Sequence, residues 1–121
     1  MSTQNPATAL RAPVEPARLA HYPSLQGRSV FVTGGGSGIG AEIVAAFVAQ
    51  GARVGFVDID AASSEALAER LRAAGLQAPW WERCDVRDIG ALQQAIGRAA
   101  AQLGDFAVLV NNVASDDRHD I

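Results

Sequence analysis

Apolar and polar positions follow two different periods along this chain from residue 24 onward. Short apolar runs, typical of strands, are followed by longer segments in which apolar residues recur every three or four positions, typical of amphipathic helices. The predicted strands are 29–33, 52–58, 77–84 and 106–111, and the predicted helices are 39–50, 61–74 and 89–103. The last strand is apolar along almost its whole length, which predicts that it is buried on both faces.

Local signals agree with these boundaries. Gly51, Gly75 and Gly104 follow the three predicted helices, as expected for C-terminal stops. Asp60 and Asp88 precede the second and third helices and are candidates for N-caps. Trp80 and Trp81 are adjacent in a predicted strand, so they should point to opposite faces, with at least one of them in the core.

Strands that alternate with helices predict an α/β fold in which right-handed crossovers build a parallel sheet. The expected strand order is 3-2-1-4, half of a doubly wound fold, with a ligand crevice between the first and fourth strands. Residues 1–23 hold four of the five prolines and are expected to form a disordered tail. The folded part is then a partial domain over 24–121.

A glycine-rich turn, 33–40, joins the first predicted strand to the first predicted helix. Gly34 allows a tight turn, Gly38 lets the backbone approach a pyrophosphate, and Gly40 lets the helix pack closely on the strand. The N–H groups at the start of the helix can donate to the phosphates. The candidate phosphate-binding residues are Gly34, Ser37, Gly38, Ile39 and Gly40. A strand, a glycine turn and a helix in this order predict a dinucleotide site. A triphosphate loop is excluded because no Lys-Ser/Thr pair follows.

Asp58 ends the second predicted strand, 20 residues after Gly38, which is close to the expected spacing of about 20 for a ribose-binding acid. Its carboxylate can accept hydrogen bonds from both adenosine ribose hydroxyls. A 2′-phosphate at the same place would meet a like charge, at a cost of a few kcal/mol at about 4 Å. Asp58 therefore predicts NAD rather than NADP, and Asp60 is the better candidate for capping the next helix.

Composition excludes several classes of protein. The net charge of −3 offers no footprint for nucleic acid, and no apolar run approaches the length of a membrane span. The single cysteine, Cys84, excludes an internal disulfide, is expected to be buried, and fits a reducing, cytoplasmic compartment. His119 and the neighbouring carboxylates do not form a metal-ligand pattern, so no metal site is predicted.

Three further positions carry a family resemblance. The glycine turn, Asp85-Val86 after the third strand, and Asn111-Asn112-Val113-Ala114 after the fourth resemble the motifs of the short-chain dehydrogenases/reductases. The resemblance implies a Rossmann-type fold, an adenine contact at Asp85 and Val86, and a cofactor contact at Asn112. Two alternatives stay open: Asp85 could simply cap the following turn, and Asn111 could only satisfy backbone groups between strands. Val113 and Ala114 depart from the family's Ala-Gly.

Within this family, the segments 22–25, 84–85 and 116–119 resemble sugar dehydrogenases that oxidise D-xylose with NAD. The resemblance implies hydride transfer between a sugar or another alcohol and NAD, no membrane or nucleic-acid partner, and a full-length relative that forms homo-oligomers. The polar cluster 116–119 would then lie near the mouth of the active site, although it reads equally well as a solvated loop.

The catalytic pair of this family, Tyr-x-x-x-Lys, does not occur in these residues. The basic residues are all Arg, and the one tyrosine, Tyr22, precedes the first predicted strand. No catalytic residue is therefore nominated, and we expect the 121 residues alone to be inactive and marginally stable, as the N-terminal portion of a longer enzyme. The alternatives are a stand-alone nucleotide-binding module and an inactive truncated gene product.

Overall fold

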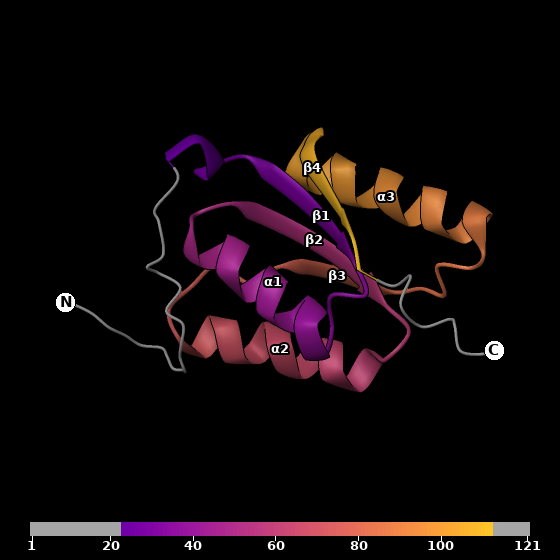
Figure 1. The fold of residues 1–121 in the computed structure, drawn as a ribbon, viewed down its shortest axis with the longest axis horizontal. Coiled ribbons are helices and arrows are strands. Elements are labelled where there is room, and N and C mark those ends of the chain that lie inside the picture. Colours follow the sequence, from indigo (N-terminus) through magenta and orange to yellow (C-terminus); the bar gives the residue numbers. More distant parts are fainter. Residues whose placement is uncertain (1–22, 113–121) are drawn as a thin grey trace.

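The computed structural model describes residues 23–112, which form one sheet and its covering helices (Figure 1). The elements are, in chain order, the short 3-10 helix η2 (Pro23–Leu25), β1 (Ser29–Thr33), α1 (Gly38–Ala49), β2 (Arg53–Asp58), α2 (Ala61–Ala73), β3 (Trp80–Arg83), α3 (Ile89–Leu103) and β4 (Phe106–Asn111). Of the predicted tail 1–23, the structure describes only Pro23, which begins η2. Residues 1–22, with Tyr22, and the segment from Val113 through the cluster 116–119 lie outside the described residues.

The strands form a four-stranded parallel sheet in the order β3-β2-β1-β4. This confirms the predicted α/β architecture and the 3-2-1-4 order. The chain moves outward from β1 to β2 and β3, then returns to the other side of β1 to form β4. The order therefore reverses between β1 and β4, where an α/β sheet of this type offers a crevice.

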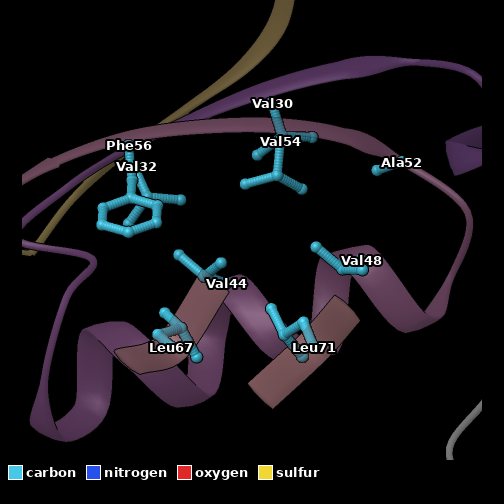
Figure 2. Packing of buried hydrophobic residues seen from close by; sticks show 9 residues of the cluster. All are labelled: Val30, Val32, Val44, Val48, Ala52, Val54, Phe56, Leu67 and Leu71. Carbon is cyan, nitrogen blue, oxygen red and sulfur yellow. The ribbon is translucent and has the colours of Figure 1, made fainter. Parts of the chain in front are cut away.

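Helices α1 and α2 cover one face of the sheet, and α3 lies on the other (Figure 1). Figure 2 shows Val44 and Val48 of α1, with Leu67 and Leu71 of α2, pointing toward the apolar side chains of β1 and β2. These side chains form one buried cluster with Val30, Val32, Ala52, Val54 and Phe56. Its helical members are spaced four apart on each helix, so one stripe of each meets the sheet, as predicted.

The second face is packed more thinly. Phe31, Val57 and Cys84 are buried there against Ala95 and Ala99 of α3. Trp80 packs on this side, whereas Trp81 packs on the first face with its ring stacked on that of Phe56 at a centroid distance of 6.4 Å. The two tryptophans therefore take opposite faces, as predicted.

Two strand predictions were wrong in part. The third strand begins at Trp80 rather than residue 77 and ends at Arg83, so the buried Cys84 lies just beyond it. Pro79 precedes the observed strand and has no N–H to donate to a neighbouring strand. Strand β4 alternates between half-buried and exposed positions instead of being buried on both faces, and the Leu109 residue is 66% exposed. Val108 and Val110 pack on the face covered by α1 and α2, whereas Leu109, paired with Phe31, lies on the α3 face, where it lines an open hollow.

Candidate functional site

The predicted site residues follow the carboxyl ends of the parallel strands. Gly34 follows β1, Asp58 ends β2, Asp85 comes shortly after β3, and Asn112 follows β4. Because the strands are parallel, these four ends lie along one edge of the sheet. The structure therefore brings the glycine turn, both candidate acids and the asparagine to the edge at which α/β sheets bind ligands.

The glycine turn is fastened to β2 by backbone hydrogen bonds. The N–H groups of Gly34 and Gly35 both donate to the carbonyl oxygen of Val57, at 2.8 and 3.1 Å. The N–H of Gly36 donates to Asp58 Oδ2 at 2.9 Å. A Cβ atom on Gly36 would lie 2.4 Å from the hydroxyl oxygen of the buried Ser64. The turn is thus held in one position between β2 and the start of α2.

The N-terminus of α1 is open. Its N-cap, Ser37, makes no side-chain cap bond, whereas Asp60 and Asp88 cap α2 and α3 by accepting from backbone N–H groups. The N–H of Ala41 donates to the carbonyl of Ser37 at 3.2 Å, and the three N–H groups before it, from Gly38 to Gly40, precede the helical hydrogen-bond series. Such N–H groups and the helix dipole favour an anion at this end.

Gly38 and Gly40 are constrained in different ways. Gly38 is exposed with φ +58°, and a Cβ atom there would meet nothing within 4 Å. At Gly40 a Cβ atom would lie 1.7 Å from the carbonyl oxygen of Gly34. Close packing of helix on turn therefore requires Gly40, while Gly38 keeps the space above the turn free. This arrangement fits the phosphates of a dinucleotide.

Asp58 is oriented by two backbone donors. Its Oδ1 accepts from the N–H of Asp60 at 2.8 Å, and its Oδ2 accepts from the N–H of Gly36. Each carboxylate oxygen keeps a lone pair for another donor. Asp60, as predicted, is the residue that caps α2, accepting from the N–H of Ser63 at 3.0 Å. Asp58 is therefore free of the capping role and can accept from a ligand.

Asp85 lies in a turn that leads into α3. The N–H of Asp88 donates to the carbonyl of Asp85 at 2.9 Å, and Asp88 Oδ1 in turn accepts from the N–H of Ala91 to cap the helix. Side-chain and backbone hydrogen bonds from Arg87 hold the pKa of Asp85 at about 2, below its usual 3.8. Val86 is half-buried and packs against the cluster on the α3 face. Asp88 therefore caps α3, whereas Asp85 caps the turn before it by accepting from the N–H of Arg87 at 3.0 Å, which is the alternative role that the sequence left open.

Asn112 ties β4 to the glycine turn. Its Nδ2 donates to the carbonyl of Gly34 at 3.1 Å, and its N–H donates to Thr33 Oγ1 at 3.0 Å. Thr33 Oγ1 lies 2.9 Å from Asn111 Oδ1, to which it donates. Both asparagines therefore connect β4 to β1 or to the turn that follows it. Asn111 Oδ1 accepts from the Thr33 hydroxyl, a side chain rather than a backbone group, and it is Asn112 that satisfies a backbone carbonyl. The cofactor contact expected of Asn112 is not tested by these bonds.

Two contributors to this edge were not foreseen. The hydroxyl of Thr33 joins β1 to β4, and the guanidinium of Arg87 donates two hydrogen bonds to the carboxylate of Asp85. The signal for Arg87 was its charge, opposite to that of Asp85 and two positions away. Opposite charges two positions apart do not by themselves predict that the side chains meet.

Beside these strand ends, a hollow of about 310 Å³ opens between α3 and β4. Its lining combines polar groups at the sheet edge, among them Thr33 and Asn111, with apolar side chains including Val86, Ile89 and Leu109. Among the described residues no cluster of His, Cys, Asp and Glu could hold a metal ion, and no helix is long and apolar enough to cross a membrane.

A family profile and individual relatives of this chain indicate the same protein family. The sequence profile described as short chain dehydrogenase matches residues 28–121. A protein of Rhizobium meliloti (strain 1021) named "Probable galactose dehydrogenase" is 54% identical over 99 residues, which are 82% of this chain and 39% of the relative. The D-xylose 1-dehydrogenase of Caulobacter vibrioides (strain NA1000 / CB15N) is 47% identical over 100 residues, 83% of this chain and 38% of the relative.

Solved structures similar to this chain indicate the same family. A short-chain dehydrogenase/reductase from Serratia marcescens BCRC 10948 superposes with a TM-score of 0.69 at 40% identity, over 75% of this chain and 37% of that one. The chain therefore spans less than two-fifths of the length of the sugar dehydrogenases named above.

Proposed function

The chain belongs to the short chain dehydrogenase family, and from this we propose that it is the NAD-binding N-terminal portion of an oxidoreductase. The enzyme would transfer hydride between a sugar or another alcohol and NAD, which accepts or donates the hydride at its nicotinamide when bound. The observation that carries the proposal is the pairing of an open α1 N-terminus with the oriented carboxylate of Asp58 at the same sheet edge.

Each end of the dinucleotide has a proposed contact. The N–H groups of Ser37, Gly38, Ile39 and Gly40 would hold the pyrophosphate, because they lie at the uncapped start of α1. The adenosine ribose would bind Asp58, and the adenine would lie against Asp85 and Val86. Asn112 would support the site, since it fixes the carbonyl of Gly34 under the turn.

The charge of Asp58 favours NAD over NADP. Asp58 keeps one lone pair on each oxygen, which suits two ribose hydroxyls, whereas a 2′-phosphate would add a second negative charge at the same place. The two residues that follow Asp58 in the chain, Ile59 and Asp60, are not basic, and the basic residue nearest to it in the sheet is Arg83, its register partner on β3. We therefore expect NAD to bind more tightly than NADP.

The proposed substrate class is a sugar. Support comes from the galactose and D-xylose dehydrogenases among the relatives, at 54% and 47% identity. D-xylose, the sugar indicated by the sequence, is proposed together with galactose as the first pair to assay. A cytoplasmic location and assembly into a homo-oligomer are proposed for the full enzyme on the same family grounds.

The cofactor proposal is tested by calorimetric titration of the chain with NAD and NADP. We expect Asp58→Ala to weaken NAD binding at least about tenfold, as for loss of hydrogen bonds to a charged group, and to narrow the difference between NAD and NADP. Asp105→Ala, which removes an exposed carboxylate in the loop before β4, is the matched control and should bind like the wild type. Tighter binding of NADP than of NAD by the wild type would contradict the proposal.

The hydride-transfer proposal is tested on the gene. The coding DNA beyond codon 121 should be read in all three frames for Tyr-x-x-x-Lys and a preceding Ser. If the pair is found in frame, the full product is assayed for reduction of NAD with D-xylose and galactose. If it is found in no frame, hydride transfer fails as a proposal and a nucleotide-binding module without catalysis replaces it.

A further inference from the structure

Arg87 occupies most of the hydrogen-bonding capacity of Asp85. Its N–H and its Nε both donate to Asp85 Oδ1, each at 3.0 Å, and its Nη2 donates to Asp85 Oδ2 at 2.9 Å. A carboxylate offers about four lone-pair positions, two on each oxygen. Three are therefore filled by Arg87, and the fourth is on Oδ2.

The rest of the turn holds Asp85 from the other sides. On one side, the N–H of Cys84 donates to the carbonyl of Asp58 at 3.0 Å, which links the turn to the end of β2. On the other side Val86 packs against the buried cluster on the α3 face. The backbone of Asp85 is thus fixed between two anchored neighbours, and the rotation of its carboxylate is left to Arg87.

We propose that Arg87 is a positioning residue for adenine recognition: it turns the Asp85 carboxylate so that a single acceptor, on Oδ2, is left for the 6-amino group of the dinucleotide. The inference rests on the proposed function, in which Asp85 contacts the adenine. It adds that discrimination between an amino group and a carbonyl oxygen at this position depends on Arg87, a residue that does not itself touch the base.

The energetic effect should appear in binding rather than in stability. The Arg87 side chain is 84% exposed and that of Asp85 is 37% exposed. An ion pair as exposed as this contributes little to folding. A bidentate pair nevertheless restricts geometry, because the planar guanidinium and the carboxylate meet through two parallel hydrogen bonds. Loss of Arg87 should therefore leave the fold intact and loosen the orientation of Asp85.

The test compares NAD with nicotinamide hypoxanthine dinucleotide, in which a carbonyl oxygen replaces the 6-amino group. We expect the wild-type chain to prefer NAD at least about tenfold, as for a hydrogen bond to a charged group. In Arg87→Ala the preference should fall to about threefold or less with an unchanged melting temperature. Arg87→Met, which keeps the aliphatic stem, should behave in the same way and guards against a loss of packing.

Arg83→Ala is the matched control. Arg83 is exposed at the end of β3 and acts on Asp85 through charge alone, so its removal changes the net charge equally without breaking the bidentate pair. It should keep the full preference for NAD. Retention of the preference in Arg87→Ala, or an equal loss in Arg83→Ala, overturns the inference while leaving the adenine contact standing. A wild-type chain that binds both dinucleotides equally overturns that contact, and the inference with it.

Discussion

Two glycines of the same turn have different physical reasons for lacking a side chain. In Gly40→Ala the new methyl would overlap the backbone carbonyl of Gly34, which is itself held by Asn112 and cannot move away. We expect a loss of at least about 3 kcal/mol in the free energy of unfolding, the upper part of the range for overpacking. In Gly38→Ala the methyl meets open space, so the cost is about 1 kcal/mol for the left-handed φ.

For NAD binding, the order of the two variants should be the opposite of their order in folding stability. A methyl on Gly38 projects toward the proposed pyrophosphate, so Gly38→Ala should lose most NAD binding while remaining folded. Urea unfolding and NAD titration of both variants separate the two effects. Gly97→Ala in α3 is the control, because its methyl also meets nothing and should raise helix stability by up to about 1 kcal/mol. Equal NAD affinity in Gly38→Ala and the wild type would refute the assignment of the phosphate site.

The role of a single residue could be predicted from the sequence where the local backbone geometry admits only a few residue types at that position. The roles of Gly40, Asp60 and Asp88 follow from a turn or a helix start that admits few residue types, and the structure confirms them. The contact between Asp85 and Arg87 depends on rotamers and on a turn whose shape is set by packing of Val86. Spacing alone carries no information on such a contact.

Among the helices, α3 depends most on its cap. It buries alanines, Ala95 and Ala99, so it gains less from apolar burial than α1 and α2 do with their valines and leucines. Asp88→Ala removes the acceptor for the N–H of Ala91 and should lower the free energy of unfolding by about 0.5–2 kcal/mol. The measurement is urea unfolding monitored by circular dichroism. The control is Asp105→Ala, which removes an exposed aspartate that caps none of the three α-helices. A shift no larger than that of the control would show that the cap contributes nothing.

The bounds of helices and strands were predicted correctly where the apolar periodicity ends at a residue that stops or caps an element. Strands β1 and β4 and helix α3 have the predicted bounds, because glycine or aspartate marks their ends. The third strand was drawn too long because residues 77–79 are compatible with a strand in composition, while Pro79 cannot take part in a ladder. The error on β4 has a different origin. An apolar run shows that a strand can be buried on both faces, but it does not show whether neighbouring elements cover those faces.

For the molecule as a whole, the two faces of the sheet are covered unequally. Two helices pack on one face and one on the other, and the hollow beside α3 exposes apolar side chains from both α3 and β4. Ile89 is 61% exposed at the start of α3, facing the same hollow as Leu109. Among residues 23–112 the outer edge of β4 has no partner strand, and an unpaired edge beside an apolar surface is a template for association with another chain.

We therefore expect the 121-residue chain to associate with itself, with a mass that rises with concentration in light scattering coupled to size exclusion. Leu109→Lys places a charge on the exposed face of β4 and should shift the chain toward the monomer, because lysine is the residue with which natural edge strands avoid pairing. Ile59→Lys, at a residue 51% exposed in the loop after β2, adds the same charge away from that surface and should leave the association unchanged. A wild-type chain that stays monomeric and melts cooperatively would show that this apolar surface is too small to drive association, and that the two clusters on β1 and β2 suffice for an independent fold.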